Sequence, residues 1–85
     1  MPSKDAEAFL LALVEELREE RTKQGVSQDS LATKSGVDRA IISRMERDLR
    51  RPGILVFYDL SAALGLPFQE LAARAACRLA GKRNR

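Results

Sequence analysis

Histidine and tryptophan are absent from this 85-residue chain, and cysteine occurs once, at Cys77. Without histidine, the usual metal ligands and the histidine-based systems of nucleophilic catalysis are missing. A single cysteine cannot form an intramolecular disulfide, and no glycine-rich phosphate loop is present. We therefore expect neither an enzyme nor a bound metal or cofactor. We expect Cys77 to be a small packed or surface residue, not a redox switch.

Long apolar runs are also absent. No stretch approaches the roughly 20 consecutive apolar residues of a membrane-spanning helix, and the amino end lacks the basic start and cleavage site of a secretory signal. The single cysteine agrees with a reducing compartment. The sequence therefore predicts a soluble, cytoplasmic protein with no membrane partner.

The chain carries a net charge of only +3, but its charges are distributed unevenly. Residues 5–20 are acidic and contain Asp5, Glu7, Glu15, Glu16, Glu19 and Glu20. Residues 39–51 are basic and contain Arg39, Arg44, Arg47, Arg50 and Arg51. A further basic group near the carboxyl end comprises Arg74, Arg78, Lys82, Arg83 and Arg85. Two interpretations of this last group remain open, a solubilising tail that is frayed over residues 81–85 and an arm that binds phosphate.

Two short helical patterns meet at a glycine near the middle of the chain. Ser27 is a favourable N-cap for a helix over residues 28–35, because its hydroxyl can accept a hydrogen bond from a free backbone amide. Gly36 follows, where the backbone can adopt a positive φ at no steric cost. Asp38 is the N-cap candidate of a second helix over residues 39–47. The pattern therefore predicts two helices joined by a tight turn.

The second of these helices has an apolar side and a polar side. Its predicted buried stripe consists of Ile42, Met45 and Leu49, spaced at i, i+3 and i+7. The opposite side carries Arg39, Ala40, Ser43, Arg44 and Arg47. On the first helix, the small side chain of Ala32 allows the two helix axes to cross closely. We therefore expect the apolar side to be buried and the basic side to face solvent.

Three further helices complete the expected fold, over residues 5–24, 54–64 and 67–80. Residues 54–58 are consecutively apolar or aromatic and could form a strand by propensity alone. No partner strand exists elsewhere in the sequence, and the apolar spacing continues as a helical stripe up to Gly65. The sequence thus predicts a single all-α domain of five helices spanning residues 1–85.

Several residues stand at offsets shared by a large group of bacterial and phage regulators. They are Gln28, Leu31, Ala32, Gly36, Val37, Ile42, Met45 and Glu46, followed by the stretch 52–65. In these residues the chain resembles the Cro and phage-repressor (C1) type of helix-turn-helix protein, the XRE family, over about residues 17–71. The resemblance implies a lambda-repressor-like fold and a DNA-binding transcriptional regulator. One departure is Asp48, which stands where the family usually has glycine and which adopts a left-handed conformation less easily.

The helix over residues 39–47 is expected to read bases, since such a helix fits the major groove of B-DNA. Arg39 and Arg44 can each donate two hydrogen bonds to O6 and N7 of guanine, and Ala40 can touch a thymine methyl group. By resemblance, these three positions match the base-contacting positions of phage repressors. The alternative is that exposed arginines on a helix are merely solvated.

Phosphate contacts are expected from other residues, since such contacts position the protein without reading sequence. Gln28 lies at a helix N-terminus, where anions bind well, and the family uses this glutamine for that contact. The remaining candidates are Ser43, Arg47, Arg50 and Arg51. The resemblance also implies a partly buried ion pair of Arg21 with Glu46 that orients the recognition helix; an exposed pair of little energetic value is the alternative.

One domain of this kind reads only a few base pairs, so we expect a homodimer on a palindromic operator. The surplus apolar residues available for an interface are Leu11, Leu55, Val56 and Tyr58, together with residues 66–68 by resemblance. The alternative is a monomer in which the helices over residues 5–24 and 67–80 pack together and absorb these groups.

Two functional hypotheses remain. The first is a regulator that binds double-stranded DNA sequence-specifically and takes no small-molecule ligand. The second is a protein-interaction module or antitoxin-type partner with the same fold and weak or no DNA binding. The arginines at the recognition positions favour the first. Within it, residues 38–47 also look like the small controller proteins of restriction-modification systems.

Overall fold

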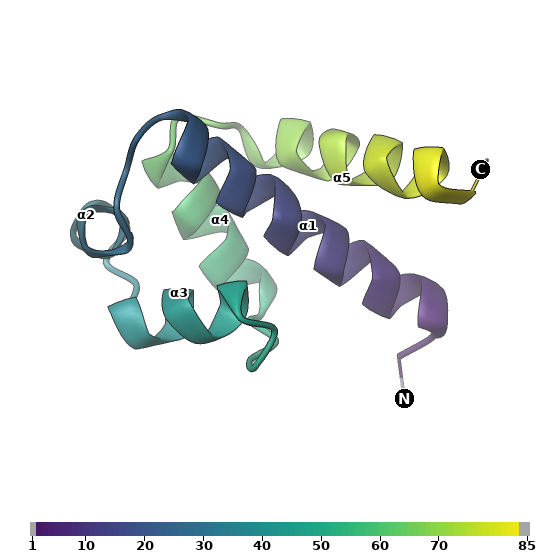
Figure 1. Cartoon of the computed structure of the whole chain (residues 1–85), viewed down its shortest axis with the longest axis horizontal. Coiled ribbons are helices and arrows are strands. Elements are labelled where there is room, and N and C mark those ends of the chain that lie inside the picture. Colours follow the sequence, from purple (N-terminus) through teal and green to yellow (C-terminus); the bar gives the residue numbers. More distant parts are fainter. Residues whose placement is uncertain (1, 84–85) are drawn as a thin grey trace.

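The computed structural model describes residues 2–83, which form five helices joined by short loops (Figure 1). The helices are α1 (Lys4–Lys23), α2 (Gln28–Ser35), α3 (Arg39–Glu46), α4 (Ile54–Ala63) and α5 (Phe68–Arg83). No strand occurs among the described residues. The predicted all-α class with five helices is confirmed, and residues 54–58 are helical.

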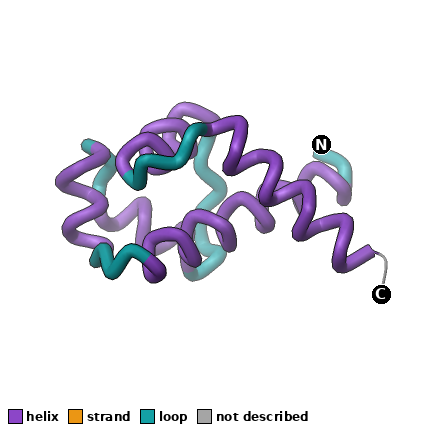
Figure 2. Tube along the Cα trace, turned by 90° about the horizontal axis from the view of Figure 1, so that it is seen from above, coloured by secondary structure: helices purple, strands orange, loops and turns teal. Residues whose placement is uncertain are grey.

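The first and last helices run in opposite directions along one side of the molecule. α1 packs more extensively against α5 than any other pair of helices does. Both chain ends lie at the same end of the molecule, away from α2 (Figures 1 and 2). α2 and α3 contact each other, and they also contact α4 and α1, respectively. The predicted helix-turn-helix unit thus lies at the other end, where α1 ends.

All five helices contribute apolar side chains to one core. The most fully buried large apolar ones are Leu17, Leu31, Ile42, Met45, Leu60 and Leu71. Each of these stabilises the fold by about 1.5–3 kcal/mol relative to an exposed position. α3 supplies both Ile42 and Met45 to this core, so its opposite side must face solvent.

Local caps fix the turn between α2 and α3. The Ser27 hydroxyl accepts a hydrogen bond of 3.0 Å from a backbone N–H in the first turn of α2. Gly36 has a φ of 77°, and its N–H donates to the Ala32 carbonyl at 2.9 Å. The Asp38 carboxylate accepts a backbone N–H of α3 at 2.8 Å. Both N-caps and the left-handed glycine predicted from the sequence are confirmed.

The end of α3 differs from the sequence prediction. α3 ends at Glu46, one residue before the expected Arg47, and Asp48 adopts a φ of 61°. The Leu49 N–H donates to the Arg44 carbonyl at 2.7 Å, which closes the helix in a Schellman motif. Leu49 therefore lies outside the helix and is 63% exposed, so the prediction that it continues the buried stripe is wrong.

The end of α5 was also predicted incorrectly. The helix continues through Gly81 to Arg83 and does not stop at residue 80. Glycine lowers helix propensity, but it ends a helix only where the backbone turns, and Gly81 does not have a positive φ. Lys82 in the added turn pairs with Glu15 of α1 at 3.4 Å, which favours the longer helix.

The longest helix of the fold is highly charged, and its apolar helix is short. α1 has 20 residues but carries many charged side chains, whereas α4 is apolar but has only 10 residues. Among residues 2–83, no single helix is both long and apolar enough to cross a bilayer; α4 and α5 reach that length and composition only when combined, with a bend of 105° between them.

Candidate nucleic-acid interface

α3 presents a polar face to solvent because its other face is anchored in the core. Ile42 and Met45 have exposed fractions of 0% and 1%. Arg39, Ala40 and Arg44 are all exposed. α3 lies along the lower edge of the molecule in the view of Figure 1, with no helix outside it in that view. The three candidate base-contacting side chains are therefore accessible to solvent on one face of α3.

Arg39, the first residue of α3, is paired with a residue of α2. The Arg39 Nε lies 2.8 Å from the Asp29 Oδ1, and the two side chains are 61% and 79% exposed. Arg44 makes no ion pair with any residue in the described part of the chain. The two candidate readers therefore differ, since only the first is held by a neighbouring carboxylate.

A partly buried ion pair connects α1 to the last residue of α3. The Arg21 Nε donates to the Glu46 Oε2 and the Arg21 Nη2 donates to the Glu46 Oε1, both at 2.8 Å. The Arg21 Nη1 donates to the Val26 carbonyl at 2.8 Å. The side chains of Arg21 and Glu46 are only 13% and 5% exposed. Each of the three guanidinium nitrogens thus donates one hydrogen bond, and the C-terminal end of α3 is fixed relative to α1.

Gln28 joins the same network. Its side chain is half-buried, and its Nε2 donates to the Glu46 Oε1 at 3.1 Å. The amide nitrogen is therefore directed at Glu46 and not at solvent, because the Glu46 Oε1 accepts a hydrogen bond from Gln28 as well as from Arg21. The Gln28 amide oxygen and the first backbone N–H groups of α2 do not take part in this hydrogen bond. The proposed phosphate contact of Gln28 stays a prediction.

The other candidate phosphate ligands occupy different environments. Ser43 is half-buried, whereas Arg47 and Arg50 are exposed and form no ion pair with residues 2–83. Arg51 pairs with Glu7 in the first turns of α1. This hydrogen bond raises the pKa of the Arg51 guanidinium. Contact with a phosphate would require Arg51 to exchange one anionic partner for another.

The sequence did not predict two acidic partners of the candidate arginines. These are Asp29, which pairs with Arg39, and Glu7, which pairs with Arg51. Asp29 lies in the first turn of α2, where its charge also favours the start of a helix. The signal that could have found its pairing is the turn at Gly36, which brings the start of α2 beside the start of α3. For Glu7, no local signal exists, because its partner Arg51 is 44 residues away.

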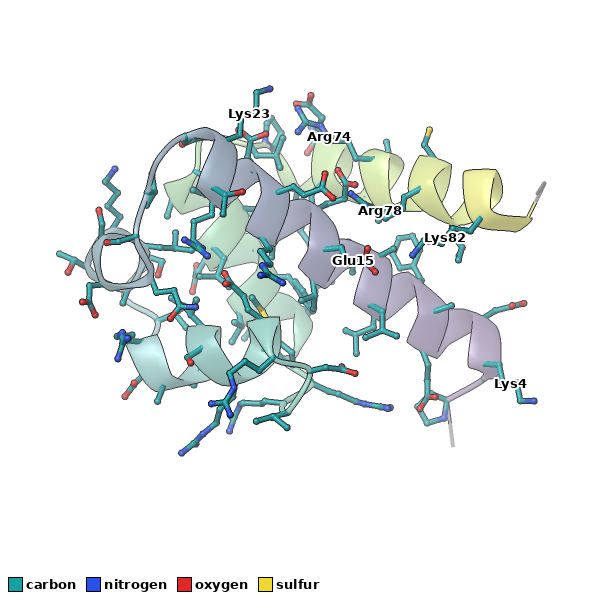
Figure 3. All side chains as sticks on the ribbon, viewed as in Figure 1. Lys4, Glu15, Lys23, Arg74, Arg78 and Lys82 are labelled. Carbon is teal, nitrogen blue, oxygen red and sulfur yellow. The ribbon has the colours of Figure 1, made fainter. Side chains whose placement is uncertain are left out.

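The basic residues of α5 face the acidic side of α1 (Figure 3). The Arg74 Nη1 donates to the Glu20 Oε1 at 2.7 Å, and its Nη2 donates to the Glu70 Oε1 at 3.0 Å. The Gln24 Nε2 also donates to Glu20, at 2.7 Å. These hydrogen bonds, that of Gln24 first and that of Arg74 second, lower the pKa of the Glu20 carboxyl.

One turn further along α5, Arg78 contacts three carboxylates of α1. Its Nε donates to Glu16 at 2.6 Å, its Nη1 donates to Glu15 at 3.0 Å, and its Nη2 contacts Glu19. The hydrogen bonds to Glu16 and Glu19 raise the pKa of the Arg78 guanidinium.

The described bases of the C-terminal group are thus neither a free tail nor a free arm, because they neutralise the excess acid of α1. Arg85 and the side chain of Arg83 lie outside the described residues. Among residues 2–82, the arginines without an ion pair are Arg18 on α1 and Arg44, Arg47 and Arg50, of which the last three cluster in sequence at and just after α3. Lys4, Lys23 and Lys34 form no ion pair with the described residues either. Arg44, Arg47 and Arg50 thus place three positive charges on and just after α3 that no described carboxylate pairs with, although the net charge is only +3.

The apolar residues proposed for an interface divide into exposed and buried groups. Leu11, Leu55 and Tyr58 are exposed, at 42%, 78% and 59%. Val56 is half-buried against the core and Leu66 is 4% exposed, so these two are not available as predicted. Ile54 is a further exposed residue, and it borders a shallow apolar hollow between α1, α4 and α5 that includes Phe9, Leu10 and Phe68. Packing of α1 on α5 therefore leaves this apolar surface uncovered.

Comparisons with known proteins agree with this geometry. The profile of a family described as helix-turn-helix matches residues 17–71, which are most of the chain. A relative from Sinorhizobium fredii (strain NBRC 101917 / NGR234), the uncharacterized HTH-type transcriptional regulator y4dJ, is 33% identical over 51 residues. That alignment covers 60% of this chain and 66% of the relative, just under two thirds of its length. No solved structure matched the chain.

Proposed function

The chain belongs to the Cro/C1-type (XRE) helix-turn-helix family of DNA-binding transcriptional regulators, and on that premise we propose that it binds a specific sequence of double-stranded DNA with α3 in the major groove. The observation that carries this proposal is the outward face of α3, where Arg39, Ala40 and Arg44 are exposed opposite a fully buried stripe. An α-helix fits the major groove, and the first turns of a recognition helix reach base edges.

In this proposal, Arg39 and Arg44 read guanine. Each guanidinium can donate two hydrogen bonds to O6 and N7, which discriminates against a wrong base by about 1–3 kcal/mol. Ala40 lies between them in sequence and offers a methyl group to a thymine methyl. The buried stripe of α3 supports this arrangement, because it prevents the helix from rotating about its axis.

The remaining candidates bind the DNA backbone. The N-terminus of α2 offers free N–H groups and the Gln28 amide oxygen to a phosphate. Ser43 lies within α3, and Arg47, Arg50 and Arg51 follow it in the chain. If about four phosphates are neutralised per subunit, log K falls with log salt by roughly 0.9 per contact. The hydrogen bonds that join Arg21, Glu46 and Gln28 fix α2 and α3 relative to each other and to α1.

The functional unit of the proposal is a homodimer on a palindromic operator. One α3 reaches only a few base pairs, so two copies are needed for a specific site, with half-sites about one helical turn apart. A second copy of the chain is the proposed partner of the apolar residues exposed on α4, which are Ile54, Leu55 and Tyr58, and of Leu11 exposed on α1. α4 begins shortly after α3 in the chain, so a contact there would couple the two recognition helices closely.

Selection of bound sequences from random duplex DNA tests the proposal directly. The wild-type protein is expected to enrich a palindrome, and Arg39→Ala and Arg44→Ala are each expected to relax the preference at one base pair of each half-site. Lys4→Ala is the matched control, because it removes an exposed positive charge from the far end of α1 (Figure 3). Retention of the wild-type motif by both arginine variants would exclude them as readers.

A second candidate function is a protein-interaction module of the same fold, which the exposed apolar surface favours. It predicts no enriched sequence in the selection and a DNA affinity that Arg44→Ala leaves unchanged. The two candidates are therefore separated by the same experiment.

A further inference from the structure

The pair formed by Arg39 and Asp29 joins the two helices of the helix-turn-helix unit at the surface proposed to face DNA. Asp29 lies in the first turn of α2, and Arg39 is the first residue of α3. Their contact is made through the Arg39 Nε, 2.8 Å from the Asp29 Oδ1. Neither side chain is buried, so the pair is not needed to fill the core.

Which nitrogen of the guanidinium lies against Asp29 determines which hydrogen-bond donors of Arg39 remain available to a ligand. The guanidinium is planar and presents its donors in a rigid fork. The Nε is the nitrogen of Arg39 that lies nearest the carboxylate in this ion pair, and the two Nη atoms donate no hydrogen bond to residues 2–83. The Nη atoms therefore remain as a pair of parallel donors, the edge that matches O6 and N7 of guanine. Asp29 therefore restricts the rotation of a long, flexible side chain and leaves its recognition edge open.

Within residues 2–83, the Asp29 carboxylate pairs only with Arg39, and its charge also favours the N-terminus of α2. The N-cap of α2 is supplied by the Ser27 hydroxyl, not by this carboxylate. The Thr33 hydroxyl donates to the Asp29 backbone carbonyl, so that contact does not involve the side chain. The carboxylate is also in a poor place for a DNA-binding protein, since an anion at the N-terminus of α2 repels the phosphates that this N-terminus would otherwise attract.

We propose that Asp29 is a specificity-determining positioning residue, which orients the guanidinium of Arg39 for guanine and disfavours binding to non-cognate DNA. The proposal rests on the proposed DNA-binding function. The two effects act in opposite directions on affinity: orientation strengthens binding to the cognate site, whereas phosphate repulsion weakens binding to every sequence. Asp29 thus increases the ratio of specific to non-specific binding.

The test compares Asp29→Asn with the wild-type protein in two measurements, selection from random duplex DNA and titration of one cognate and one scrambled duplex. We expect Asp29→Asn to lose about fivefold or more of the base preference at the position that Arg39→Ala also relaxes, and to bind the scrambled duplex more tightly than the wild type. Asp59→Asn is the control, because it removes an exposed carboxylate from α4 and should change neither the motif nor the affinity ratio. Thermal unfolding of both variants verifies that they are folded.

A double variant separates positioning from a general electrostatic effect. In an Arg39→Ala background, Asp29→Asn is expected to cause no further loss of base preference, because its action passes through Arg39. The role of Asp29 would be overturned if Asp29→Asn kept the wild-type motif. It would also be overturned if Asp29→Asn reduced the base preference as much in the Arg39→Ala background as in the wild-type protein. Either result would leave the proposed function intact. Failure of the wild-type protein to enrich any sequence would overturn both.

Discussion

Arg21 of α1 and Glu46 of α3 are joined by two hydrogen bonds of 2.8 Å in a site where both side chains are nearly inaccessible to water. The pair connects the longest helix of the fold to the end of the helix proposed to enter DNA. Arg21 also donates to the Val26 carbonyl, in the loop before α2. One guanidinium of α1 therefore contacts both the following loop and α3.

Loss of one member of this pair is expected to be costly. Glu46→Gln leaves the Arg21 cation buried without a counterion, and should lower the free energy of unfolding by about 3 kcal/mol. Denaturant titration measures the change. Glu70→Gln, which disrupts an exposed pair with Arg74, should have a much smaller effect. Equal losses in the two variants would mean that burial of Arg21 and Glu46 adds nothing to their pairing.

The stability of the fold should depend on the ionisation of Glu20. Hydrogen bonds from Gln24 and Arg74 lower the pKa of this carboxyl in the folded state below its ordinary value of 4.5. The ionised form therefore stabilises the fold at pH values above 4.5, and this contribution is lost as pH falls through the lowered pKa. Glu20→Gln should be less stable than the wild type at about pH 7, and the difference should shrink toward about pH 3. Denaturation curves across this range would contradict the assignment if the difference stayed constant.

The left-handed backbone at Asp48 offers a test of local strain. A non-glycine residue at a φ of 61° is disfavoured, although aspartate tolerates this region better than most residues. Asp48→Gly should raise the free energy of unfolding by up to about 1 kcal/mol, and Asp48→Ala should lower it by about 1 kcal/mol. Thermal unfolding of the two variants side by side gives the answer. An alanine variant as stable as the glycine variant would show that this backbone is unstrained.

The apolar surface of α4 makes a separate prediction about assembly. Leu55→Glu places a charge on a side chain that is 78% exposed, so it should leave folding intact but convert the proposed dimer to a monomer. Light scattering after size-exclusion chromatography measures the mass, and helical circular dichroism monitors the fold. Lys23→Glu, at the C-terminal end of α1, is the charge-changing control. A wild-type protein that is monomeric over a wide concentration range would reject this interface.

The sequence predicted the helices well because their signals are local. Ser27, Gly36 and Asp38 each act within a few residues of their own position, and the structure shows all three in the expected roles. The two errors at helix ends have different origins. Leu49 fits a helical stripe by spacing, but the left-handed backbone at Asp48 turns the chain out of the helix. Gly81 has the composition of a stop, but the pairing of Lys82 with Glu15 favours continuation.

The candidate site could be predicted only in part. The exposed positions of Arg39 and Arg44 follow from the periodicity of α3, since Ile42 and Met45 must face the core. The periodicity does not predict whether a carboxylate pairs with either arginine. Asp29 holds Arg39 but no carboxylate holds Arg44 among the described residues, although both arginines lie on the same short helix.

The sequence by itself determined the helices, the glycine turn and the face of α3 that turns outward, because hydrogen bonds and apolar spacing within a few residues control them. Only the tertiary structure decided which charges neutralise one another. Arg74, Arg78 and Lys82 are balanced by the glutamates of α1, whereas three arginines at and after α3 are not. The physical reason is that an ion pair forms between atoms a few ångströms apart in space, and distance along a chain does not specify that separation until the helices have packed.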